Sequence, residues 1–170
     1  MILFSLLLLY VLLLKGLPFA LYPNYLFPGK VERYPALVKL SEKLRGKDRQ
    51  ETLENAFAYL REYHPGEHAI WKWRSLKTLF LIGDFSTEPF LGRKTFLWCH
   101  TQNRLLKSLL VNSGHFREDE VRIGRMFFRN HNSPTFGYSV FIHQYALVDF
   151  DGRTTVKADP FYGIFEERSH

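Results

Sequence analysis

Apolar side chains recur every three or four positions in three segments of the chain, which is the spacing of an amphipathic helix. The segments are residues 35–44, residues 48–63 and residues 99–112. Asp48, followed three residues later by Glu51, forms a capping-box pattern, so we expect the second helix to begin there. We interpret the first two helices as a scaffold for the rest of the domain.

The second half of the chain changes to the alternation of apolar and polar positions that is typical of strands. Residues 121–128 indicate one strand, residues 138–149 a longer one, and residues 153–159 a return strand. Helices followed by antiparallel strands are the pattern of an α+β domain. The fold class that we predict is therefore α+β, with N-terminal helices followed by an antiparallel sheet.

The turn between the last two strands decides which of their residues face each other. If residues 150–152 form a three-residue loop, Gly152 takes the left-handed conformation that this loop type requires, and His143 faces Asp159 on one side of the sheet. A two-residue Asp-Gly turn would instead bring Asp159 opposite Gln144, so that its side chain points away from His143. The sequence suits both turns.

The amino end is an unbroken apolar run over residues 1–14. Fourteen helical residues reach only about 21 Å, short of the roughly 30 Å hydrocarbon core, but a helix continued to the end of the apolar region would span it. We expect residues 1–22 to form a hydrophobic membrane anchor or, as the alternative, a signal segment. Residues 23–34 contain two prolines and a glycine, which indicates a linker before a domain of residues 35–170.

Basic residues follow the apolar run, and by the positive-inside rule they favour a membrane-associated domain on the cytoplasmic side; a secreted protein is the alternative. The formal net charge of the 170-residue chain is +6. The basic residues are scattered and form no recognised nucleic-acid motif, so we expect no nucleic-acid partner. The oligomeric state is left open by the sequence.

The chain contains a single cysteine, Cys99, at the first turn of the third predicted helix. It lies in line with Asn103, Leu106 and Leu110, and therefore with the buried stripe of that helix. Buried cysteine commonly acts as a small apolar side chain. Alternatively, the unpaired N–H groups and the dipole at a helix start favour the thiolate form, which is the nucleophilic form.

The residues around Cys99 resemble a known family once the later segments are included. Trp98-Cys99 followed by a leucine-rich helix, His143 in a strand 44 residues later, and Asp159-Pro160 at the end of the next strand are similar to the motifs of the transglutaminase-like superfamily, which is related to papain. Motif-level similarity is confined to residues 96–114 and 140–160. The resemblance implies a transglutaminase-like, cysteine-proteinase-like core.

That resemblance assigns Cys99 as nucleophile, His143 as its base and Asp159 as the residue that orients the imidazole. It implies a thiol-dependent acyl-transfer enzyme that acts on amide bonds of a protein or peptide substrate, by hydrolysis in preference to crosslinking. The family motif has no histidine at the position of His100. The alternative is a non-catalytic domain of the same fold that serves as a binding or scaffold module at a membrane.

A zinc site is the remaining chemical alternative. It would be drawn from Cys99, His100, His115, His131 and His143, and their spacings match no standard set of zinc ligands. We therefore expect neither a metal nor an organic cofactor.

Overall fold

The computed structural model of the chain describes residues 4–6, 9, 30–66, 86–126 and 143–169. The helices, in chain order, are α3 (Pro35–Leu44), α4 (Arg49–Tyr63) and α6 (Cys99–Asn112), with short 3-10 helices at Glu88–Phe90 and Glu118–Glu120. The strands are β1 (Val121–Met126), β2 (His143–Asp149), β3 (Thr154–Asp159) and β4 (Ile164–Ser169).

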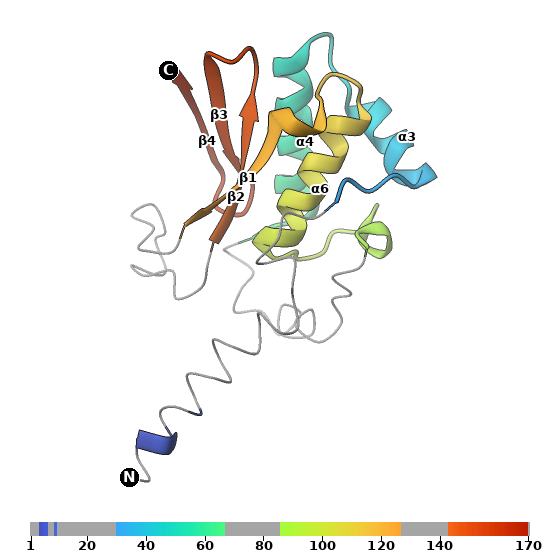
Figure 1. Cartoon of the computed structure of the whole chain (residues 1–170). Helices are drawn as coiled ribbons and strands as arrows, with labels where there is room; N and C mark the ends of the chain where they lie inside the picture. The colour runs from blue at the N-terminus through green and yellow to red at the C-terminus, as the bar shows by residue number, and fades with distance from the viewer. Residues whose placement is uncertain (1–3, 7–8, 10–29, 67–85, 127–142, 170) are drawn as a thin grey trace.

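The four strands form one antiparallel sheet in the order β1-β2-β3-β4. The three helices lie together on one side of this sheet (Figure 1). Helix α6 packs on β2 and β1, and α3 and α4 pack in turn on α6. The expected α+β class is thus confirmed, whereas the transglutaminase-like core remains a prediction.

Most of residues 1–22, where we expect the anchor or signal segment, lie outside the described residues. Among the residues that the structure does describe, no helix has the length and the apolar character needed to cross a membrane. The last part of the predicted linker is described, and it is attached to α6. The backbone N–H of Glu32 donates to the Ser108 hydroxyl (3.0 Å), and Asn112 Nδ2 donates to the Glu32 carbonyl (2.7 Å).

The start of α4 agrees with its sequence signal. Asp48 Oδ1 accepts a hydrogen bond from the backbone N–H of Glu51 (2.9 Å), as an N-cap residue does. Glu51 Oε2 accepts from the N–H of Lys47 (2.7 Å), one residue before the position that a standard capping box uses. Two of the donors at this helix end are therefore satisfied by side chains.

Helix α6 lies at the centre of the core and not at its edge. Every residue from Cys99 to Leu110 is buried, including Arg104 and Lys107. Its leucines meet Leu53 and Leu60 of α4 and the apolar face of β2 and β3 in one cluster. The sequence predicts an amphipathic helix with one buried stripe, and the additional burial arises because β2 covers one side of α6 while α3 and α4 cover others.

The register of the β2–β3 hairpin differs from both predicted registers. Asp149 pairs with Thr155, and the N–H of Phe150 donates to the Thr154 carbonyl (3.0 Å). Gly152 has φ +76°, the left-handed conformation that was predicted for it. The pairing is shifted by two residues from the three-residue-loop alternative. Since side chains alternate with a period of two, this shift leaves His143 and Asp159 on the same face.

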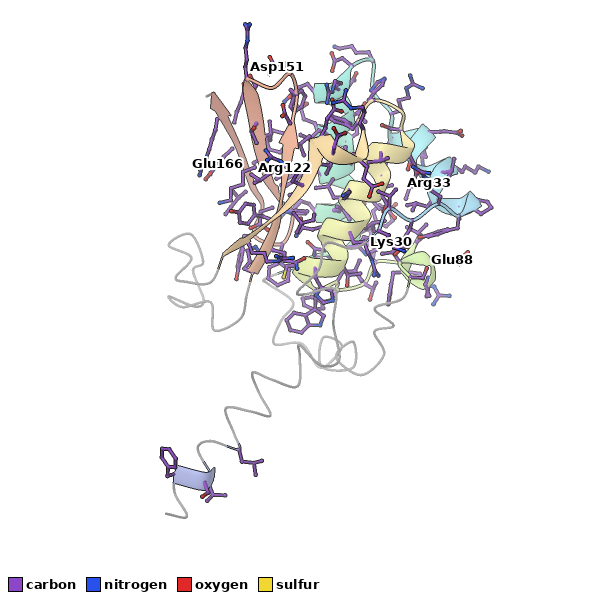
Figure 2. The ribbon with its side chains drawn as sticks, viewed as in Figure 1. Lys30, Arg33, Glu88, Arg122, Asp151 and Glu166 are labelled. Carbon is purple, nitrogen blue, oxygen red and sulfur yellow. The ribbon has the colours of Figure 1, made fainter. Side chains whose placement is uncertain are left out.

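Two carboxylates explain the longer turn. Asp149 Oδ1 accepts from the N–H groups of Asp151 and Gly152, and Asp151 Oδ1 accepts from those of Arg153 and Thr154. Such side-chain bonds stabilise a turn of the backbone locally. Figure 2 shows Asp151 at the tip of the hairpin, the end of β2 that is distant from His143.

Strand β4 lies where the sequence pattern predicts no strand. It pairs with β3 from Asp159↔Ile164 to Thr154↔Ser169, after a tight turn in which Gly163 has φ +73°. Its sequence, Ile-Phe-Glu-Glu-Arg-Ser, has no regular alternation. Its assignment therefore depends on pairing with β3.

Candidate thiol site

Cys99 is the first residue of α6, and Trp98, with an extended backbone, is its N-cap. The segment that enters the helix is fixed by the N–H of Thr95, which donates to the carbonyl of Tyr63 at the end of α4 (2.8 Å). The first intrahelical bond runs from the N–H of Gln102 to the Trp98 carbonyl. The Cys99 N–H thus lies at the start of the helix, ahead of the first intrahelical hydrogen bond.

His143 is the first residue of β2, and Asp159 is the last residue of β3. His143 Nε2 lies 2.6 Å from Asp159 Oδ2, and the side chains of His143 and Asp159 are 3% and 0% exposed. In the observed register, continued beyond Ala146↔Ala158, Asp159 would face Tyr145, so His143 and Asp159 are diagonal neighbours and not opposite each other. Diagonal neighbours in a sheet are within reach of longer side chains.

The Cys99 thiol and the His143 imidazole are near enough for each to shift the pKa of the other. Because Nε2 of His143 faces Asp159, Nδ1 is the ring nitrogen available to the thiol. The structure therefore brings together all three residues that the sequence singled out. Their roles in catalysis stay a prediction.

Burial and charge act in opposite directions on the thiol. Burial raises the pKa of Cys99, but the charge of His143 and hydrogen bonds with His100 and His143 outweigh it and lower the pKa from 9.0 to about 5. Burial likewise lowers the pKa of His143, and the charge of Cys99 together with the hydrogen bond to Asp159 reverses this and raises the pKa to about 10. The favoured state is thus a thiolate paired with an imidazolium.

His100 is part of this site, although the sequence suggested it only as a zinc ligand and not as a partner of the thiol. Its side chain is buried at the second position of α6, and its interaction with Cys99 helps to lower the pKa of the thiol. Two imidazoles therefore interact with one sulfur. The position of His100 directly after Cys99 at a helix start could have indicated this interaction. It was not interpreted in that way because the family motif has no histidine at this position.

Two aromatic rings adjoin His143. The ring of Tyr162 lies 4.6 Å from the imidazole and that of Phe161 lies 5.7 Å away, both centroid to centroid. Phe161 also contacts Phe96, which in turn packs against Trp98. A row of aromatic side chains thus runs from the imidazole to Trp98, the residue before Cys99.

Two buried amides on α6 hold the surrounding backbone. Asn103 Nδ2 donates to the carbonyl of Cys99 (2.7 Å) and to the carbonyl of Gln144 (2.8 Å). Gln102 Nε2 donates to the carbonyls of His64 (2.7 Å) and Leu97 (3.0 Å). Both side chains are fully buried. The sequence pattern did not indicate that either amide connects two elements. Their acceptors are backbone carbonyls, which every residue carries, and two of these acceptors are far away in the chain.

Among the described residues, no three His, Cys, Asp or Glu side chains are arranged to hold a metal ion. His131, one of the residues weighed for zinc, lies outside the described part of the chain. His115 lies away from the thiol and contacts the Thr52 hydroxyl and Arg45. It thus connects the loop after α6 with the first turns of α4 and with Arg45.

Comparisons of the chain with protein-family models, with characterised proteins and with solved structures found no match.

Proposed function

We propose that the protein is a thiol-dependent acyl-transfer enzyme that hydrolyses amide bonds of a protein or peptide through Cys99, His143 and Asp159. The observation that carries the proposal is the buried position of His143 between two groups: its Nε2 lies 2.6 Å from Asp159 Oδ2, and the charge of Cys99 raises its pKa. A nucleophile, a base and a group that orients the base are the parts of a catalytic triad.

In this mechanism the Cys99 thiolate attacks the carbonyl carbon of the amide and forms a C–S bond, while the carbonyl electron pair moves onto oxygen. The N–H of Cys99 at the start of α6 donates to that oxyanion. The oxyanion then collapses, the C–N bond breaks, and protonated His143 transfers its proton from Nδ1 to the leaving amine nitrogen. A thioester remains on Cys99.

Neutral His143 next removes a proton from a water molecule, and the resulting hydroxide attacks the thioester carbonyl. The C–S bond breaks, the carboxylic acid product leaves, and the thiolate–imidazolium pair is restored. The Asp159 carboxylate stabilises the imidazolium in both half-reactions. An amine in place of water would give transfer instead of hydrolysis, and the resemblance to small peptidase-like members of the superfamily supports water.

The N-terminal apolar run supports a second element of the proposal, which is attachment to a membrane through residues 1–22. Lys30 and Arg33 follow it on the surface of the domain (Figure 2).

One observation favours the alternative, a non-catalytic transglutaminase-like scaffold at a membrane. The Cys99, His143 and Asp159 side chains are no more than about 3% exposed, so the described residues leave the thiol little access to a substrate. A buried thiolate without access would serve only the stability of the domain.

Labelling with an iodoacetamide-type thiol probe at pH 6 distinguishes the two. The enzyme proposal expects rapid labelling of the wild type, none of Cys99→Ala and at least tenfold slower labelling of His143→Gln. His115→Gln is the matched control, because it removes a hydrogen-bonded imidazole away from the thiol. Labelling that persists in His143→Gln, or a folded wild type that does not react, contradicts the proposal.

A further inference from the structure

The carboxamide of Asn103 lies between the helix that carries the thiol and the strand that carries the histidine. Its nitrogen donates to the Cys99 carbonyl on its own helix and to the Gln144 carbonyl on β2, at 2.7 and 2.8 Å. Gln144 is the residue after His143. One side chain therefore connects the backbone of the nucleophile with the backbone next to the base.

We propose that Asn103 is the positioning residue of the thiol site, which sets the start of β2 against the first turn of α6 so that the His143 ring reaches Cys99. This inference rests on the proposed function, since it describes how the same site is assembled. Asn103 touches neither the thiol nor the substrate in this scheme and acts through the two backbones.

The chemistry of the amide suits this position. Both neighbours are carbonyl oxygens, so the group between them must supply two N–H donors from one atom, and only the NH₂ of an amide or a cationic group does so. A hydroxyl has a single hydrogen, and a carboxylate has none to donate when ionised. A cation would repel the protonated imidazole in a buried site, which leaves a neutral carboxamide such as that of Asn103.

The geometry of the strand adds to the requirement. β2 reaches the thiol site with its first residue, and there it pairs with β1, through Met126↔His143 and Arg125↔Gln144, whereas its pairing with β3 runs from Ala146 to Asp149. The sheet partner β1 sets the position of this end of β2 within the sheet, and the bond from Asn103 to Gln144 sets its position against α6. A buried donor that spans two elements specifies their relative position, because leaving either carbonyl without a partner has a free-energy cost.

Gln102 supplies a matched comparison. It is the preceding residue of the same helix, is equally buried, and also donates two hydrogen bonds to carbonyls, but its acceptors are His64 and Leu97 and not β2. The variants Asn103→Leu and Gln102→Met remove the same number of hydrogen bonds with little change of volume. They differ in whether the connection to the histidine strand is lost.

The test is the rate of alkylation of Cys99 by iodoacetamide between pH 4 and 10 in the full-length chain. The proposal expects Asn103→Leu and the smaller Asn103→Ala to react at least about tenfold more slowly at pH 6, with a midpoint shifted towards that of an ordinary thiol. Gln102→Met is expected to keep the wild-type midpoint even if its thermal stability falls as much. A purely structural role would lower stability in both without moving the midpoint.

The proposal is overturned if the folded Asn103 variants retain the wild-type midpoint, if Gln102→Met shifts it as far, or if both Asn103 variants fail to fold while Gln102→Met folds. A wild type without low-pH reactivity overturns the proposed function as well. A reactive wild type beside equally reactive Asn103 variants overturns only the role of Asn103. The two failures are therefore distinguishable.

Discussion

Nε2 of His143 lies 2.6 Å from Oδ2 of Asp159 across two neighbouring strands, with both side chains buried. The charge of Cys99 and this hydrogen bond together keep the imidazole protonated against the effect of burial. A protonated imidazole in turn stabilises the thiolate of Cys99. Residues of β2 and β3 thereby favour the thiolate form of Cys99 at the start of α6.

The first prediction concerns the pH dependence of the thiol. Because the pKa of Cys99 is lowered to about 5, alkylation should reach its plateau near pH 6 and not continue to rise towards pH 9. The measurement is the iodoacetamide rate as a function of pH, followed by mass spectrometry. A midpoint at the value of a free thiol would contradict the assignment of an ion pair.

The Cys99–His143 ion pair contributes to the free energy of unfolding within a limited pH range. The folded-state pKa of Cys99 lies below its ordinary value, so its contribution is lost as the pH falls through about 5; the pKa of His143 is raised, so its contribution is lost as the pH rises through about 10. The free energies of unfolding of the wild type and of Cys99→Ala, measured in urea, should therefore converge outside this pH range. A constant difference from pH 4 to pH 10 would refute the linkage.

Replacing Asp159 by asparagine should remove the negative charge beside His143 while keeping the volume of the side chain. The imidazole loses the carboxylate that favours its charged form, so the pKa of His143 should fall and labelling of Cys99 at pH 6 should slow by at least about tenfold. The labelling rate and the histidine titration measured by NMR check this. Unchanged labelling in a folded variant would leave Asp159 without a role in activation.

A buried ion pair is predicted to fix residues 30–34 on α6. Glu32 Oε1 lies 3.0 Å from Arg104 Nε, and Glu32 Oε2 accepts from the N–H and the hydroxyl of Thr87. Glu32→Gln removes the carboxylate charge that faces Arg104 in a buried position, so the free energy of unfolding should fall by about 3 kcal/mol. Thermal and urea unfolding measure the change.

Glu62→Gln is the matched control for that experiment. Glu62 pairs with Lys94 at the same 3.0 Å distance, but both side chains are mostly exposed. Solvent screening makes such a pair nearly neutral, so the free energy of unfolding should change by less than about 1 kcal/mol. Equal effects of the two substitutions would show that burial does not determine the contribution of the Glu32–Arg104 pair.

His64 should make the domain less stable in acid. Burial lowers the pKa of this histidine from 6.5 to about 4, partly offset by the hydrogen bond to the Thr95 carbonyl. The unfolded chain therefore binds a proton more readily than the folded one, and stability is lost as the pH falls from about 6.5 towards 4. The difference amounts to at most about 3 kcal/mol. His64→Gln should reduce this acid sensitivity in urea titrations at pH 7 and pH 4.5, and an identical pH dependence would contradict it.

The sequence by itself determined the features that depend on neighbours along the chain. The bounds of α3, α4 and α6, the cap at Asp48 and the positive φ of Gly152 follow from helical periodicity and from local backbone chemistry. Of the two registers that the sequence allowed, one placed His143 and Asp159 on the same face, and the observed register keeps that arrangement because alternation along a strand survives a shift of two residues.

Only the tertiary structure decided the features that depend on distant partners. The hairpin register was decided by the side chains of Asp149 and Asp151 in the turn, and β4 by its pairing with β3. The burial of α6 on all sides, the proximity of His100 to the thiol and the link from Asn103 to β2 require elements that are far apart in the chain. Periodicity reports which face of an element is apolar, but it does not report which other element will supply the partner of a buried polar group.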